Sequence, residues 1–173
     1  LTYGGVTYAA SCTGTAFAGA APPVTYQATD SLSRTFSSTY TPTVYGVPAA
    51  AADTSTGAFN TAQTISPLAN DTAGAATSLT ASSVKLCTTA TANGSCLGTS
   101  LTMPGEGSYT VNGSGVVTFT PLATFTGTAT QIKYVVTDSV GQVANSTITP
   151  TVGLPAAVTM NPNTTTGGQG ITQ

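Results

Sequence analysis

The stretch IKYVVTDS at residues 132–139 matches the stretch VTYQATDS at residues 24–31, 108 positions earlier in the chain. In both stretches the first, third and fifth residues are apolar, whereas Lys133 in one copy corresponds to Thr25 in the other. Apolar residues at every second position are typical of a β-strand with one buried face. The pattern therefore predicts a strand at each place, with the apolar set facing a core and Lys133 facing away from it.

Similarity continues on both sides of these strands. Because the matches keep nearly the same offset, they indicate an internal repeat of about 108 residues. We predict that residues 1–47 are the last part of one repeat, that 48–153 are a complete repeat, and that 154–173 are a linker and the start of the next. The further matches are FAG at 17–19 with FTG at 125–127, YTPTV at 40–44 with ITPTV at 148–152, VTY at 6–8 with VTF at 117–119, and GVPAA at 46–50 with GLPAA at 153–157.

The two incomplete ends do not add up to a second repeat. Together they lack the equivalents of about 67–111, so joining them head to tail would leave a sheet short of strands. We therefore expect the native protein to continue on both sides, or another chain to supply the missing strands.

Short runs rich in Val, Thr, Tyr and Phe alternate with Gly, Pro, Asn and Ser clusters every 8–12 residues, and this spacing is typical of a sandwich or barrel. No segment has a helical period with caps. The expected fold is therefore all-β, with Ig-like antiparallel β-sandwich repeats in tandem. Asn112-Gly113 predicts a two-residue hairpin turn. Pro150 costs a ladder hydrogen bond, so its strand should lie at a sheet edge or end near the proline.

The composition excludes several classes of function. Only 5% of the 173 residues are charged, and three basic residues with a net charge of −2 cannot form the basic surface that a nucleic-acid-binding protein needs. The absence of His excludes Ser–His and Cys–His nucleophiles and His-liganded metals. No stretch approaches 18 consecutive apolar residues, so we expect no membrane span. We also expect no enzymatic activity and no cofactor.

Several motifs follow one another along residues 67–152, namely PLANDT at 67–72, GSYTV at 107–111, GVVTFTP at 115–121, FTGTA at 125–129, YVVTD at 134–138 and TPTV at 149–152. Their order resembles the tandem Ig-like and cadherin-like repeats of giant bacterial surface proteins, and it is most similar to the CshA-type fibril repeat. That resemblance implies a non-catalytic β-sandwich module repeated many times in a surface fibril or stalk. Related repeats often bind Ca²⁺ through acidic linkers, but the linkers of this chain carry almost no acidic residues.

Three cysteines indicate an oxidising, extracellular environment. A Cys87–Cys96 disulfide would close a loop of about ten residues and stabilise the fold by roughly 2.5–3 kcal/mol. A two-residue turn at Asn93-Gly94 would not place Cys96 opposite Cys87, so the disulfide requires a longer loop; the alternative is two buried thiols. Cys12 pairs with a cysteine outside this segment or in another chain, or remains a free thiol.

Asp71 and Asp138 are the candidates for a cation site, but Ca²⁺ requires six to eight oxygen ligands. Because Asp138 and Asp30 occupy the same repeat position between two strands, we interpret them as turn residues and predict no bound metal. Lys133 could form an internal Lys–Asn crosslink only if it were buried beside an acid, and the strand pattern places it outside. Glu106, the only glutamate, has no second acid near it in sequence with which to form a glycosidase pair.

We therefore expect a structural repeat of a bacterial surface fibril or filament, located outside the cell at its surface, with neighbouring copies as its partners. Two alternatives remain. One is an adhesin module that binds an unidentified host or cell-surface ligand, for which Tyr3 and Tyr45 are candidate contact residues. The other is a self-polymerising subunit that is completed by strands from a neighbouring chain.

Overall fold

The structure, a computed structural model, describes residues 2–3, 6–7 and 19–156 of the chain. All the long elements are strands, as the sequence predicts. The only helices in this described part are two 3₁₀ turns, η1 (Pro67–Ala69) and η2 (Asn93–Ser95), and neither is long or apolar enough to cross a membrane. The strands are β1 (Thr2–Tyr3), β2 (Val6–Thr7), β3 (Gly19–Ala20), β4 (Val24–Thr29), β5 (Thr35–Tyr40), β6 (Thr43–Val44), β7 (Asp53–Gly57), β8 (Gln63–Ile65), β9 (Leu79–Thr88), β10 (Ser100–Met103), β11 (Gly107–Val111), β12 (Val117–Pro121), β13 (Gly127–Thr128), β14 (Ile132–Asp138) and β15 (Val143–Val152).

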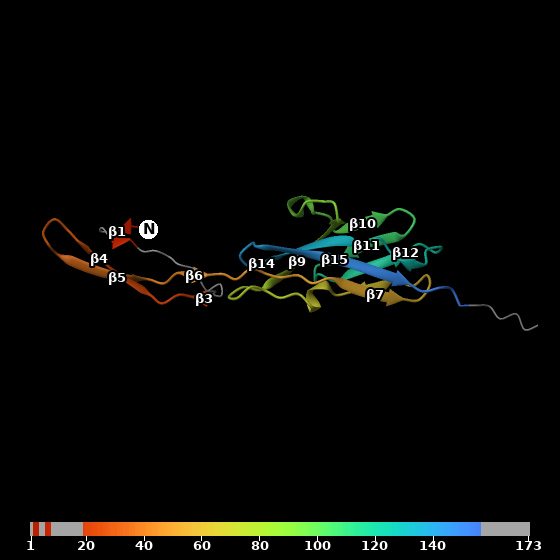
Figure 1. The fold of residues 1–173 in the computed structure, drawn as a ribbon, viewed down its shortest axis with the longest axis horizontal. Coiled ribbons are helices and arrows are strands. Elements are labelled where there is room, and N and C mark those ends of the chain that lie inside the picture. The colour runs from red at the N-terminus through yellow and green to blue at the C-terminus, as the bar shows by residue number, and fades with distance from the viewer. Residues whose placement is uncertain (1, 4–5, 8–18, 157–173) are drawn as a thin grey trace, which may run out of the picture.

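Two sheets pack against each other in the region from β7 to β15 (Figure 1). One sheet has the order β10-β11-β12-β8 and is antiparallel throughout. The other has the order β13-β15-β14-β9, also antiparallel, and β7 adds to it in parallel beside β15. The all-β sandwich is therefore confirmed, and the parallel β7–β15 pair is an addition that the sequence pattern did not predict.

The core lies between the two sheets and contains the residues that alternation placed inward. Tyr109 and Phe119, on neighbouring strands, pack with ring centroids 4.6 Å apart, and Phe125 meets Phe119 edge-on at 6.4 Å. Burying large aromatic and branched side chains supplies most of the free energy that favours such a fold. Ile132, Tyr134 and Val136, which the alternation predicts to face inward, are buried. The other buried residues of the neighbouring strands are Tyr109, Val117, Phe119, Ala144, Ile148, Pro150 and Val152.

The strand that contains Pro150 is not an edge strand, so that alternative of the sequence prediction is wrong. β15 lies between β14 and β7, and Pro150 is the third residue from its end. The carbonyl of Pro150 accepts a hydrogen bond from the N–H of Ala129 (2.9 Å). The N–H and C=O of a strand residue point to the same side, so the missing donor faces the break between β13 and β14 and removes no bond to β7.

The predicted two-residue Asn112-Gly113 turn is also wrong, because the loop between β11 and β12 spans 112–116. Oδ1 of Asn112 accepts hydrogen bonds from the N–H groups of Ser114 (2.9 Å) and Val116 (3.0 Å). Gly115, with φ of 75°, takes the left-handed conformation that the turn requires. The asparagine thus acts through its side chain, as an Asx turn, and not through its own backbone angles.

The N-terminal hairpin, formed by β3, β4, β5 and β6, reproduces the pairing of β13, β14 and β15. Val24 pairs with Tyr40 as Ile132 pairs with Ile148, and Gly19 pairs with Val44 as Gly127 pairs with Val152. Even the hydrogen bond beside the proline recurs, from the N–H of Ala21 to the carbonyl of Pro42 at 2.8 Å. The 108-residue offset in the sequence is therefore also an offset in strand register.

Candidate functional site

Glu106, the only glutamate of the chain, serves a structural role. The carboxylate of Glu106 accepts hydrogen bonds from the N–H (2.8 Å) and the hydroxyl of Thr130, and so ties the β10–β11 turn to the segment before β14. No three His, Cys, Asp or Glu side chains within the described part of the chain gather into a possible metal site. We therefore place the candidate site at the connection between the N-terminal hairpin and the sandwich.

The segment between β6 and β7, residues 45–52, is bonded along its length to the loop that follows η1. The N–H of Gly46 donates to the carbonyl of Ala75 (3.0 Å), and Ala49 and Thr72 exchange two backbone hydrogen bonds (2.9 and 2.8 Å). Side chains continue the attachment, because Oδ1 of Asp71 accepts from the N–H of Ala51 (2.8 Å). This segment, which we call the linker, therefore lies on the surface of the sandwich.

Two further side-chain contacts hold the two ends of residues 45–52. At the first end, Nε2 of Gln142 donates to the carbonyl of Gly46 (2.8 Å) from the β14–β15 turn. At the second end, Nδ2 of Asn70 donates to the carbonyl of Ala52 (3.2 Å). We call residues 70–75 together with Gln142 the linker clamp. It explains the PLANDT motif physically, since Asn70, Asp71 and Thr72 each bond the linker backbone.

Two glycines bring the linker and the clamp into backbone contact. A Cβ on Gly74 would lie 2.0 Å from the carbonyl oxygen of Gly46, and a Cβ on Gly46 would lie 2.4 Å from the backbone nitrogen of Ala75. Real Cβ atoms do not approach other atoms so closely, and the obstructing atoms are backbone atoms that cannot rotate away. Any other residue at either position would therefore push the linker off the clamp.

A small polar cluster supports the clamp from beneath. The hydroxyl of Tyr134 donates to the carboxylate of Asp71, at 2.8 and 2.9 Å from its two oxygens. Asp53, at the start of β7, is buried, and within the described structure its Oδ2 has no hydrogen-bond partner. Burial, together with the negative charge of Asp71, raises the pKa of Asp53 to about 6. The acid beside Asp71 is thus Asp53, and Asp138 makes its bonds elsewhere.

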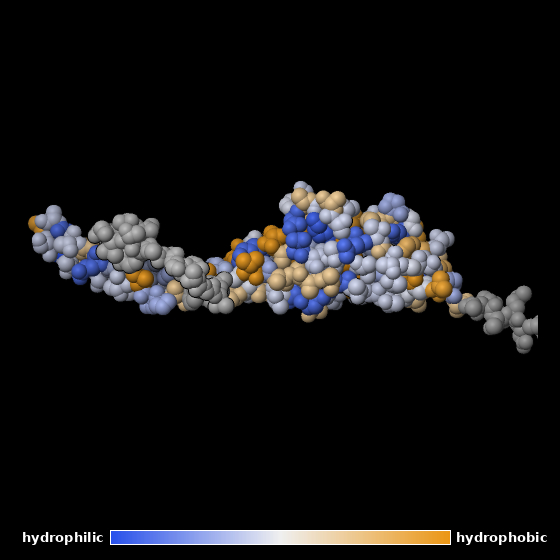
Figure 2. Space-filling view, in the orientation of Figure 1, coloured by the Kyte–Doolittle hydropathy of each residue, from blue (hydrophilic) through white to orange (hydrophobic). Residues whose placement is uncertain are grey.

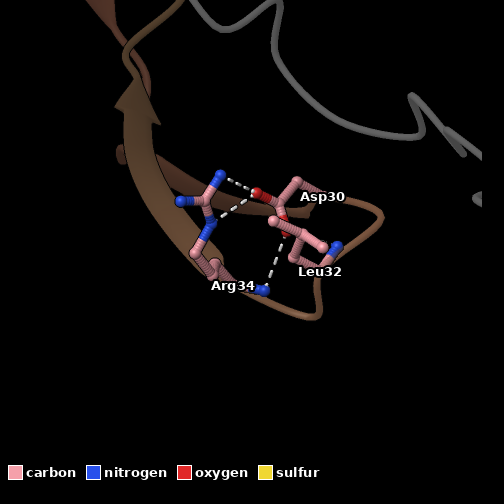
Figure 3. Close-up of polar contacts among 3 residues, drawn as sticks. All are labelled: Asp30, Leu32 and Arg34. Carbon is pink, nitrogen blue, oxygen red and sulfur yellow. Dashed lines mark hydrogen bonds and ion pairs between the residues drawn. The ribbon is translucent and has the colours of Figure 1, made fainter.

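Asp30 and Asp138 hold the turns of the two matching hairpins in the same way. Oδ1 of Asp30 accepts from the N–H groups of Leu32 (2.9 Å) and Arg34 (3.0 Å) (Figure 3). The backbone and side-chain bonds from Arg34 lower the pKa of Asp30. Oδ1 of Asp138 accepts from Val140 (3.0 Å) and Gln142 (2.8 Å), at the equivalent spacing. Both acids therefore have the Asx-turn geometry that their shared repeat position indicated.

A disulfide closes the connection between β9 and β10. It joins Cys87, near the end of β9, to Cys96, and the two Cα atoms are 5.3 Å apart. Instead of a two-residue Asn-Gly turn, the chain forms η2 and returns to pair Gly98 with Leu86, so the loop is long enough for the bond. Lys133 lies under this loop and donates to the carbonyl of Thr91. The face away from the core is thus partly covered. Cys12 lies outside the described residues.

Sequence reasoning identified Asp30 and Asp138 as turn residues, but it missed the linker clamp and the same turn geometry at Asn112. Asp30, Asn112 and Asp138 each precede by three positions a residue with positive φ, namely Ser33, Gly115 and Gly141. The sequence signals this conformation only where that residue is glycine, after Asn112 and Asp138. The clamp had no such signal, because most of its contacts use backbone groups or join residues 18 to 96 positions apart. The sequence showed Asn70 only as part of a motif, and it showed Asp71 as part of that motif and as a candidate for a cation site.

Residues 46–152 match the family model described as the surface adhesin CshA repetitive domain. The match covers more than half of the chain, so the chain belongs to this family. Membership makes it a repeat domain of a surface adhesin, and the family implies a location at the cell surface. No curated protein matches the sequence. The matched range begins at Gly46, so it includes the clamped linker as well as the sandwich.

Proposed function

We propose that this chain is a length of stalk in an extracellular bacterial surface fibril, in which the repeats act mechanically and hold a distal part away from the cell. In this proposal 48–153 is one repeat, 1–47 ends the repeat before it, and 154–173 opens the next. Its partners are neighbouring copies in the array, and it requires no cofactor or chemical reaction.

The observation that carries the proposal is the linker clamp. A flexible linker would let each repeat reorient freely, because free chain segments lose length through random coiling. A linker bonded by its backbone to the following repeat, with Gly46 against Gly74, fixes the direction in which the preceding hairpin leaves. In Figure 1 the hairpin extends beyond the end of the sandwich along the long axis of the molecule. Repetition of this connection would give a stiff, extended array.

The test is ¹⁵N relaxation of the full chain, which compares rotational tumbling of β4–β5 with that of β14–β15. We expect the two hairpins to share one correlation time in the natural sequence. Gly74→Val should detach the linker and make the N-terminal hairpin tumble faster. The amide chemical shifts of the sandwich should stay dispersed, which shows that it remains folded. Thr54→Ala, at an exposed position of β7, is the matched control and should change nothing. Independent tumbling of the hairpin in the natural sequence would contradict the proposal.

A further inference from the structure

The first and last strands of the sandwich lie side by side and run in the same direction (Figure 1). β7 pairs with β15 in parallel, from Asp53 opposite Ile148 to Gly57 opposite Val152. A tension on the chain enters the sandwich at the start of β7 and leaves it at the end of β15, so it acts at opposite ends of this pair. The two strands must then slide past each other, and the backbone hydrogen bonds between them are loaded together.

The N-terminal hairpin responds to the same tension in the opposite way. The chain enters it at Gly19 and leaves it at Val44, and these two residues pair with each other. Val24 and Tyr40 pair next, and the antiparallel pairing continues to the turn. Tension therefore separates the open end of the hairpin and breaks its bonds one after another. One chain thus contains a strand pair that unzips under tension and a strand pair that shears.

β7 is the strand on which the resistance of the sandwich depends. β15 is held on both sides, by β13 and β14 on one and by β7 on the other, whereas β7 pairs with β15 alone among the described strands. The side chains of Thr54 and Thr56 are exposed, and Figure 2 shows a pale, weakly hydrophilic surface where β7 lies in Figure 1. The outer surface of β7 thus adds little apolar burial, so its pairing with β15 and its inward contacts hold it in place.

A buried glutamine reinforces the pair from the opposite sheet. Gln63 of β8 is 6% exposed, and its Nε2 donates to the carbonyl of Thr151 on β15 (3.0 Å). Its Oε1 accepts from the hydroxyl of Ser55 on β7 (2.6 Å). Gly57 makes room for this side chain, since a Cβ there would lie 2.6 Å from Cγ of Gln63. One buried amide with its hydrogen bonds made therefore ties both strands together and opposes their sliding.

We propose that the β7–β15 pair together with Gln63, which we call the tension lock, makes the sandwich resist tension along the chain and yield to a force that peels β7 away. The linker precedes β7, so the bonds of the linker clamp are loaded first and the tension lock bears the force once they break. A stalk bears tension, so the lock adds strength to the function proposed above, but the two fail separately. A loosely jointed repeat can contain a strong sandwich, and a stiff linker can join sandwiches that yield easily.

The test is single-molecule pulling of the full chain in two directions, in a Cys12→Ser background with Val140→Cys as the internal attachment point. Pulling between the two termini should first unzip the N-terminal hairpin at low force. The sandwich should then unfold at high force in one step that releases roughly 300 Å of chain, since the Cys87–Cys96 disulfide keeps the residues between them from extending. The same background without Val140→Cys is the control and should give the same force between the termini.

The second direction pulls between the N-terminus and position 140, in the β14–β15 turn that contacts the linker through Gln142. Both points lie at the end of the sandwich where β7 starts, so this force peels β7 from β15 one bond at a time. We expect the sandwich to yield at a force lower by about two-fold or more, because forced unfolding depends on the barrier along the pulled direction. Equal forces in the two directions would overturn the proposal.

Two proline substitutions locate the resistance in β7. The carbonyl of Gly57 accepts from the N–H of Gly153 (2.9 Å). The backbone groups of Ser55, two residues before Gly57, therefore also face β15, whereas those of Thr54 face away. Ser55→Pro should lower the force between the termini by about a third or more, and Thr54→Pro, the matched control, should leave it unchanged. Equal forces in the two variants would overturn the assignment to β7. The comparison of directions needs neither proline, so it decides the proposal even where Ser55→Pro does not fold.

Discussion

The two hairpins of this chain share a register and a turn but differ in their surroundings. Asp30 and Asp138 form the same Asx turn, and the strands on either side pair residue for residue at an offset of 108. The apolar face of the β14–β15 hairpin is nevertheless buried in the core, whereas the equivalent face of the β4–β5 hairpin is exposed to solvent. Local sequence is therefore sufficient for the turn and the pairing, and burial depends on strands elsewhere in the chain.

Truncating the same tyrosine in each hairpin should give the largest difference between them. Tyr134→Ala removes a fully buried ring and its hydrogen bond to Asp71, and should lower the free energy of unfolding of the sandwich by about 3–5 kcal/mol. Tyr26→Ala, the matched change at an exposed position, should alter that free energy by less than about 0.5 kcal/mol. Urea denaturation monitored by far-UV circular dichroism measures both. Equal losses would mean that the two hairpins belong to one cooperative unit.

Removing the disulfide tests a feature that the structure places only beside the C-terminal hairpin. The Cys87–Cys96 loop covers Val135 on the outer face of β14, and the three residues form a small buried cluster. Replacing both cysteines by serine should lower the stability of the sandwich by about 2–3 kcal/mol, since the bond closes a loop of about ten residues. Hydrogen exchange in β4 and β5 should not change. Faster hydrogen exchange in β4 and β5 as well would show that the two hairpins do not unfold independently.

Asp53 should make the sandwich less stable as the pH rises. Its pKa in the folded chain is about 6, above the ordinary value near 4, because it is buried and lies near Asp71. The folded state therefore holds the proton more tightly, and stability falls as the pH increases between about 4 and 6. Asp53→Asn should remove this dependence and raise the free energy of unfolding at pH 7.5 by about 2 kcal/mol.

Urea denaturation at pH 4.5 and pH 7.5 measures the effect of Asp53→Asn, which should be larger at the higher pH. Thr54→Asn, on the exposed side of the same strand, is the control and should leave the pH profile of the natural sequence intact. A gain of equal size at both pH values would show that charge at Asp53 is not the cause.

Much of the sandwich was predictable because its information is local and repeated. Alternation in two copies identified the buried face of β14, and the shared position of Asp30 and Asp138 indicated their turns. The absence of His excluded His-activated nucleophiles and His-liganded metals without any structure. The division of the chain into three repeat units stays a prediction, because its test requires the measurements of tumbling and exchange proposed above.

The remaining features depend on long-range contacts that one sequence does not reveal. The parallel pairing of β7 with β15 and the linker clamp bring together residues up to 96 positions apart. The position of Pro150 depends on the break between β13 and β14, which alternation cannot locate. The 112–116 loop was misread for a different reason, because Asn-Gly is compatible with two turns and the deciding residue was Gly115.

The smallest expected effect is at the turn position where Ser33 of one hairpin corresponds to Gly141 of the other. Substitutions there change the backbone conformation of the turn without changing the burial of the hairpin. Gly141 has φ of 85° and Ser33 has φ of 62°, so both are left-handed, but only glycine adopts this conformation without strain. A Cβ on Gly141 would meet no atom within 4 Å, so Gly141→Ser should cost about 1 kcal/mol of sandwich stability through backbone strain alone. Ser33→Gly should relieve the same strain in the exposed hairpin without changing the unfolding midpoint of the sandwich. Thermal unfolding of the two variants measures this, and a Gly141→Ser variant as stable as the natural sequence would show that the Asx bonds of Asp138 alone hold the turn.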